Sequence, residues 1–161
     1  MQPFTKRRYE GLGQFWADLR LLWGRRREVR EILRGKGISP DFRERLILAV
    51  TAVNKCRFCS FAHTRAALRE GVSREEVNGL LSGTFDGVPD PERTAVLYAQ
   101  HWAESKGEPE PGAAERVASE YGPETASRID TTLRFINFCN LFGNTADWLL
   151  YTVSFGLLGN R

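Results

Sequence analysis

The sequence predicts an all-α protein, and two observations carry this prediction. Apolar residues recur at helical spacing through most of the chain, and no convincing alternating strand pattern appears. Glycine and proline punctuate these segments at positions where helices start and stop. The composition indicates one ordinary globular domain, since 42% of the 161 residues are hydrophobic and 27% are charged.

The first 36 residues are expected to form a basic helical extension. They contain ten Lys and Arg against four Asp and Glu, so this segment has a net charge of about +6, whereas the whole chain has +3. Apolar residues from Phe15 to Leu33 recur as on one amphipathic helix, which ends at Gly35. Glu28 and Glu31 interrupt the arginines and no nucleic-acid-binding motif accompanies them, so we expect neither nucleic acid nor a membrane as partner. The main domain is expected at residues 37–161.

Local signals predict the helices of this domain in order. Ser39 and Pro40 are a start signal for a helix that runs to Asn54. A helix should begin near Cys56 and end at Gly71, and Ser73 has the spacing of a capping box for a short one. The later expected segments are a helix from Asp90, a linker at 106–112, and a long apolar helix or helix pair from Pro123 to the C-terminus.

The predicted compartment is the cytoplasm. Nothing resembles a secretory signal. The apolar segment 135–158 is long enough to span a membrane, but Asn137, Asn140, Asn144 and Asp147 lie within it. Stable disulfides are rare in the cytoplasm, so a close cysteine pair there is more often catalytic or metal-binding.

Two of the three cysteines and one of the two histidines lie within the stretch VNKCRFCSFAH. If Cys56 opens a helix, the offsets to Cys59 and His63 place all three on one face. A helix N-terminus stabilises a thiolate and lowers a cysteine pKa, so the residues alone favour Cys56 as the more acidic thiol. A second cysteine one turn away can form a disulfide, and a histidine one turn further can relay a proton.

Three interpretations of the cluster compete. A structural zinc site needs a fourth ligand, which Cys139 or His101 would have to supply from far along the chain. The cysteines can also be inert packing residues of a buried helix. We favour a thiol–disulfide site, because two cysteines and a histidine in register are not typical of packing alone.

The same residues resemble a known family. Glu44, eleven residues, Cys56, two residues, Cys59, three residues and His63 are similar to the E-x11-C-x2-C-x3-H signature of alkylhydroperoxidase D-like proteins, which belong to the carboxymuconolactone decarboxylase superfamily. The stretch TRAALREGVSREEV also resembles the continuation of that family. The resemblance extends over roughly residues 39–81 and is weaker towards the C-terminus.

This resemblance implies an all-helical homo-oligomer that reduces hydroperoxides without metal or cofactor. Its oxidised cysteine pair is then reduced by an external dithiol reductant. It implies that Cys59 attacks the peroxide, that Cys56 resolves the product, and that Glu44 and His63 relay protons. Some members carry a histidine immediately before the later cysteine, where this chain has Phe58. The true lactone decarboxylases generally lack the cysteine pair, so the pair favours redox chemistry.

Two alternatives and one ambiguity accompany this hypothesis. The alternatives are a lyase acting on a small lactone, with Glu44 and His63 as acid and base, and a non-catalytic redox sensor. The ambiguity concerns the polar stripe of Asn137, Asn140, Asn144 and Asp147. We expect this stripe to face solvent or another subunit, unless Asn140 or Asn144 lines the thiol pocket. Apolar residues around most of the same helix predict subunit contacts.

Overall fold

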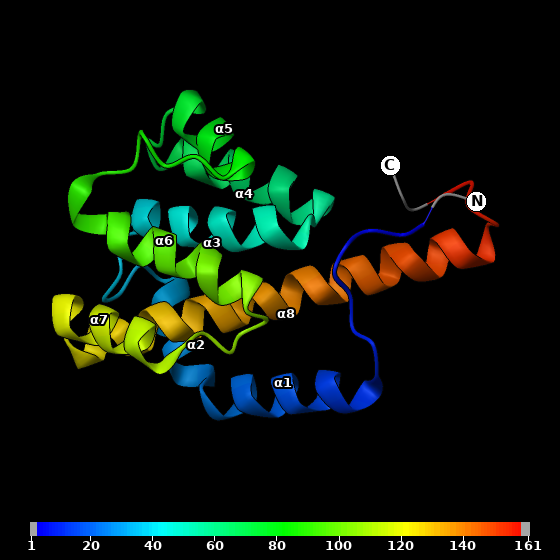
Figure 1. The fold of residues 1–161 in the computed structure, drawn as a ribbon, viewed down its shortest axis with the longest axis horizontal. Coiled ribbons are helices and arrows are strands. Elements are labelled where there is room, and N and C mark those ends of the chain that lie inside the picture. The colour runs from blue at the N-terminus through cyan, green and yellow to red at the C-terminus, as the bar shows by residue number, and fades with distance from the viewer. Residues whose placement is uncertain (1–2, 159–161) are drawn as a thin grey trace.

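The computed structural model describes residues 3–158, and over this range it is all-helical (Figure 1), which confirms the predicted fold class. No strand occurs among the described residues. The helices are α1 (Leu12–Gly24), α2 (Arg26–Leu33), α3 (Pro40–Asn54), α4 (Arg57–Arg69), α5 (Arg74–Ser82), α6 (Asp90–Glu104), α7 (Pro111–Tyr121) and α8 (Pro123–Val153).

Helix α3 forms the centre of the molecule, with the α4–α5 pair on one side of it and α6 and α8 on others (Figure 1). It begins at Pro40 and ends at Asn54, as predicted. Its consecutive residues from Leu46 to Thr51 are all buried, so it meets neighbours around its whole circumference. Lys55 then adopts a left-handed conformation (φ 56°), and this tight turn leads directly into α4.

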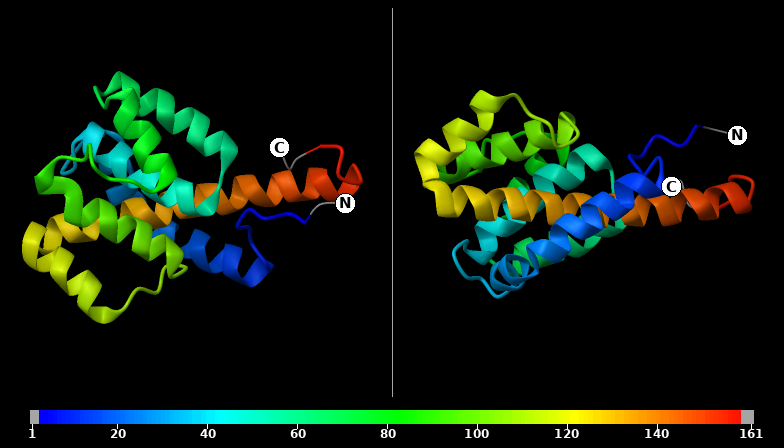
Figure 2. Two further views of the ribbon diagram at one scale, coloured as in Figure 1. Left: turned by 45° about the horizontal axis from the view of Figure 1, so that its top comes forward. Right: turned by 90° about the horizontal axis from the view of Figure 1, so that it is seen from below.

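Helix α8 is a single 31-residue helix that passes through Gly143 without ending. Its first half buries Ile129, Leu133 and Ile136 in the core. Its second half projects beyond the other helices, and the segment before α1 runs alongside it (Figures 1 and 2). The backbone N–H of Tyr9 donates to Thr145 Oγ1 across this contact (3.1 Å). The segment before α1 therefore packs along the C-terminal half of α8.

The basic N-terminal segment is two helices, so the expectation of one continuous helix from Phe15 to Leu33 was wrong. The break is at Arg25, which follows Gly24, a residue that weakens helices. The Arg25 side chain donates to Asp130 Oδ2 (2.6 Å) and to Thr131 Oγ1 (2.9 Å) on α8. These long-range bonds stabilise the changed direction of the chain, which local periodicity cannot predict.

Of the other local predictions, the cap of α5 is confirmed, whereas one helix was missed. The Ser73 hydroxyl accepts from the Glu76 N–H (3.1 Å), which confirms the predicted cap of α5. Helix α7 was not predicted, and it shortens the expected linker at 106–112. Within residues 3–158, no helix combines the length and apolar character that a membrane crossing needs. The domain boundary at residue 36 stays a prediction.

Candidate active site

Cys56 and Cys59 lie together at the start of α4, as predicted. Cys56 is the N-cap residue, and its Sγ accepts a hydrogen bond from the backbone N–H of Cys59 (3.4 Å). The two Sγ atoms are 2.7 Å apart and both cysteines are free. Cys56 is 1% exposed and Cys59 is 6% exposed. The thiols therefore form a buried, reduced pair that needs little movement to form a disulfide.

The two thiols have opposite pKa shifts. The hydrogen bond from the Cys59 side chain, together with the weaker one from the Cys59 backbone N–H, lowers the pKa of Cys56 to about 7, against the effect of burial. The same contact with Cys56, together with burial and the nearby charge, raises the pKa of Cys59. The pair therefore releases its first proton near neutral pH, and the resulting charge rests mainly on Cys56. This agrees with the expectation from helix position.

Glu44 and His63, which are 19 positions apart, meet beside the cysteine helix. His63 Nδ1 lies 2.7 Å from Glu44 Oε2, so the carboxylate fixes the orientation of the imidazole ring. Glu44 is only 2% exposed, and its other oxygen accepts from Arg43 Nε (3.1 Å) and Nη2 (2.9 Å). The Arg43 guanidinium compensates the buried carboxylate charge. His63 follows Cys59 by one helical turn, on the same face of α4.

The expectation that the asparagines of α8 face solvent or another subunit was wrong for Asn140 and Asn144, which are buried against α3. Asn54 Nδ2 donates to Oδ1 of Asn137 (2.9 Å) and of Asn140 (3.2 Å). Asn140 Nδ2 donates to Thr51 Oγ1 (3.3 Å), and a hydrogen bond from Asn140 also lowers the pKa of Cys59. Asn140 thus belongs to the wall of the thiol site, which was the alternative expectation.

Asn144 supports the turn that carries Cys56. Its Nδ2 donates to the backbone oxygen of Asn54 (2.8 Å), at the end of α3, and to that of Arg7 (2.7 Å). One residue earlier on α8, Gly143 packs against the pair, because a Cβ there would lie 3.4 Å from Cys56 Sγ. Helix α8 therefore approaches the cysteines closely, and its asparagines satisfy backbone groups exposed at the turn.

The N-terminal segment adds charges near Cys56. Lys6 Nζ and Asp147 Oδ2 form a 2.8 Å ion pair in which the Lys6 side chain is largely buried. Lys6 lowers the pKa of Cys56 and Asp147 raises it. Lys6, Arg43, Asn54 and Gly143 are site residues that sequence reasoning missed. Arg43 adjoins Glu44 in sequence and Asn54 lies two residues before Cys56, whereas Lys6 and Gly143 have no such local signal.

Cys139 and His101, the two remaining candidate ligands from the sequence, do not contact the Cys56–Cys59 pair as metal ligands would. Cys139 is half-buried on α8, and burial raises its pKa to about 11, which fits the expectation of an unreactive thiol. His101 contacts Glu110 on the surface. Among the described residues, no three His, Cys, Asp or Glu side chains gather in a group suited to a metal ion.

The model of the carboxymuconolactone decarboxylase family matches residues 21–100, about half of the chain. The chain belongs to this family. The matched region contains Glu44, both cysteines of the pair and His63, and the match confirms the resemblance stated from the sequence at the level of the family. Comparison with curated proteins found no match, and comparison with solved structures found none either.

Proposed function

We propose that this chain is a thiol-dependent peroxidase that reduces hydroperoxides with Cys56 and Cys59 and a Glu44–His63 proton relay. The observation that carries the proposal is the buried contact of two free thiols, 2.7 Å apart, one of which has a pKa lowered to about 7. A thiolate at neutral pH is the nucleophile that attacks peroxide oxygen, and an adjacent thiol resolves the product. Membership of the family is compatible with this activity.

The proposed reaction balances in three steps. A cysteine thiolate attacks the terminal oxygen of ROOH, the O–O bond breaks, and the leaving alkoxide takes a proton to become ROH. The attacking cysteine is then a sulfenic acid, whose sulfur is attacked by the second thiol to give a disulfide and water. An external dithiol reduces this disulfide by thiol–disulfide exchange and is itself oxidised.

We assign the attack to Cys59 and resolution to Cys56. Cys56 Sγ is almost fully buried against Gly143, whereas Cys59 is the more exposed thiol and shares a helix face with His63. The thiolate of the resting pair rests on Cys56, so Cys56 accepts the proton of Cys59 across the 2.7 Å contact as Cys59 attacks. The roles implied by the resemblance and the pKa order are then compatible.

Glu44 and His63 supply the proton for the departing alkoxide. With Nδ1 held by Glu44 at 2.7 Å, His63 has Nε2 available to hold a proton at the substrate. The Arg43 guanidinium pairs with Glu44 Oε1 (2.9 Å) and so fixes the carboxylate that orients the His63 ring. Arg43 therefore acts through Glu44 as a positioning residue.

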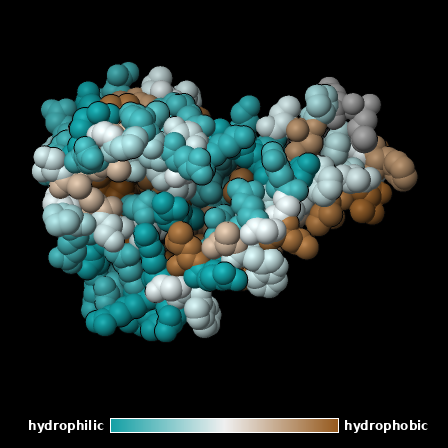
Figure 3. Space-filling model, turned by 60° about the horizontal axis from the view of Figure 1, so that its bottom comes forward, coloured by the Kyte–Doolittle hydropathy of each residue, from teal (hydrophilic) through white to brown (hydrophobic). Residues whose placement is uncertain are grey.

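We further propose that the enzyme is a cytoplasmic homo-oligomer. A dithiol cycle requires a compartment that keeps thiols reduced. The second half of α8 exposes Phe142, Leu149, Leu150 and Val153. Figure 3 shows apolar side chains gathered along this projecting end of the molecule. A row of this kind on a helix is typical of a protein–protein contact, and a second copy of the chain is the partner we expect.

A peroxide-consumption assay with a dithiol donor tests the function. We expect turnover by the wild type, loss of at least about a hundredfold in Cys59→Ser and Cys56→Ser, and no loss in the control Cys139→Ser. Equal rates in the wild type and Cys59→Ser exclude a peroxidase. Lactone turnover that survives Cys59→Ser but not Glu44→Gln supports the lyase instead.

Trapping the sulfenic acid tests the order of attack. We expect the trapped adduct on Cys59 in the Cys56→Ser variant, where no thiol resolves it. An adduct that forms only in Cys59→Ser reverses the assignment of the two cysteines.

A further inference from the structure

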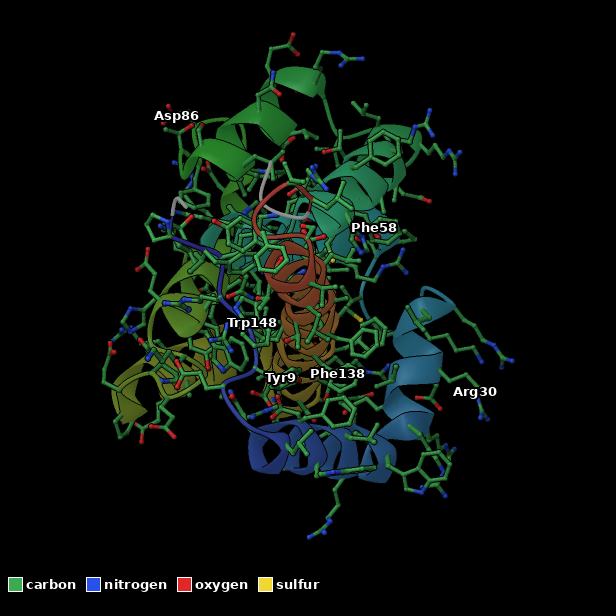
Figure 4. All side chains as sticks on the ribbon, turned by 90° about the vertical axis from the view of Figure 1, so that its right-hand side faces the viewer. Tyr9, Arg30, Phe58, Asp86, Phe138 and Trp148 are labelled. Carbon is green, nitrogen blue, oxygen red and sulfur yellow. The ribbon has the colours of Figure 1, made fainter. Side chains whose placement is uncertain are left out.

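A shallow apolar groove lies between α1, α2 and α8, beside the candidate active site. Its volume is about 470 Å³, within the usual range of small-molecule sites. Its lining includes Leu22, Trp23, Leu33, Phe135, Phe138 and Cys139. Figure 4 looks along α8 from its C-terminal end and shows Phe138 among the side chains between α8 and the two N-terminal helices. The lining is almost entirely hydrocarbon, so the groove suits an apolar chain.

Three arginines of α2 and its C-cap, Arg26, Arg30 and Arg34, also line the groove. They follow one another at intervals of four residues and so share one helix face, where like charges destabilise a helix. Among the described residues, the side chains of Arg30 and Arg34 have no hydrogen bond or ion pair. Arg27, which points elsewhere on the same helix, pairs with Glu31 (3.3 Å). The groove thus combines an apolar floor with uncompensated positive charge at its edge.

The groove lies near both the cysteine pair and the Glu44–His63 proton relay of the proposed active site. Cys139 in its wall lies one residue before Asn140, which contacts Cys59. A cavity of about 10 Å³ shares Val29, Leu33 and Phe135 with the groove, and Arg43 lines this cavity as well. Because Arg43 holds Glu44, it stands between the groove and the proton relay.

We propose that this groove binds the hydrocarbon chain of a long-chain fatty-acid hydroperoxide, with its carboxylate held by Arg30 and Arg34. The assignment of the substrate rests on the proposed peroxidase function, whereas binding of the acyl chain does not. A carboxylate would compensate the positive charge of Arg30 and Arg34. The planar guanidinium group of arginine can donate two parallel hydrogen bonds to one carboxylate. A single alkyl chain suits a groove of this size and composition.

Calorimetric titration with palmitate below its micelle concentration tests the binding site directly. It is done on the full chain carrying Cys56→Ser and Cys59→Ser, so that no redox chemistry intervenes. Adding Arg30→Gln and Arg34→Gln should weaken palmitate binding about tenfold and leave binding of hexadecanol, which has no charge, within about twofold. Trp23→Ala should weaken both ligands, and it is tolerable because Trp23 is 68% exposed. The matched control is Arg27→Gln, which should change neither.

Turnover then tests the substrate class. The wild type should reduce linoleic acid hydroperoxide with a higher kcat/KM than tert-butyl hydroperoxide. Arg30→Gln with Arg34→Gln should lower only the former value, by about tenfold. Palmitate binding without turnover of any hydroperoxide keeps the groove and overturns the proposed function. Turnover of tert-butyl hydroperoxide without palmitate binding keeps the function and overturns this inference.

Two further results overturn the inference in favour of another occupant. The first is that Trp23→Ala changes the oligomeric state in sedimentation while palmitate binding is unaffected, which assigns the groove to a second copy of the chain. The second is binding to vesicles of anionic phospholipid without binding to monomeric palmitate, which assigns the face to a membrane surface.

Discussion

Two faces of one helix contrast most sharply in this protein. On one face of α8, the side chains of Asn140 and Asn144 are fully buried and bond to α3. On another, Phe142 is 57% exposed, and Leu149 and Val153 follow it along the projecting half. Polar groups inside and apolar groups outside reverse the usual distribution. The buried amides form part of the thiol site, and the exposure of the apolar face supports the proposal that it contacts a partner.

The largest expected effect is on the exposed face. Leu149→Asp with Val153→Asp should lower the self-association constant at least about a thousandfold, because charges cannot be buried in an apolar contact without pairing. Analytical ultracentrifugation measures this constant. Thr152→Asp, on the same segment but on a residue whose hydroxyl bonds only to its own helix, is the control. A wild type that sediments as a monomer at high concentration removes the proposed interface.

The next effect is on the buried face. Asn140→Leu should lower the free energy of unfolding by about 3 kcal/mol, since it removes the hydrogen bonds of Asn140 with the buried side chains of Asn54 and Thr51. Val153→Asn, a change in the opposite direction on the exposed face, should alter it by less than about 0.5 kcal/mol in the monomer, because Val153 is 78% exposed. Denaturant titration of both variants gives the comparison. Similar losses in the two variants contradict the contrast between the faces.

The pH dependence of thiol alkylation tests the site that the buried face encloses. Reactivity in the wild type should rise with a midpoint at pH about 7, and in Cys59→Ala the midpoint should move up towards the ordinary value of 9.0, because the hydrogen bond from Cys59 is the largest cause of the shift. The folded pKa of Cys56 is below its unfolded value. The reduced protein should therefore gain stability between about pH 7 and 9 and lose it as the pH falls through 7. An unchanged midpoint in Cys59→Ala contradicts the assignment.

The smallest effect is at Gly143, on the helix face that meets Cys56. Alanine has a higher helix propensity, and its Cβ would lie 3.4 Å from Cys56 Sγ, an ordinary contact distance. Gly143→Ala should therefore raise the free energy of unfolding by up to about 1 kcal/mol. It should also slow disulfide formation, because Cys56 Sγ loses space to move. Thermal unfolding and the rate of oxidation by diamide measure the two effects, and a large destabilisation would indicate a tighter contact than this distance implies.

The sequence predicted the site residues that lie close together along the chain and missed most of those that come from remote segments. Cys56, Cys59 and His63 share one helix, so their common face follows from their spacing. Glu44 was predicted only because it occupies the glutamate position of the family signature, and the structure shows that it contacts His63. Asn140 and Lys6 meet the pair from remote segments; Asn140 was only the alternative expectation for the polar stripe, and Lys6 was not predicted.

Local sequence was enough to predict the helical fold class, the bounds of α3, the cap of α5 and the family, because each depends on residues within a few turns or on a matched pattern. The break at Arg25 and the burial of the α8 asparagines depend on contacts between remote segments, which no local pattern contains. A helical period shows which residues share a face, but α8 has both a polar and an apolar face. Which of them is buried depends on the groups that α3 and the Lys55 turn leave to be satisfied.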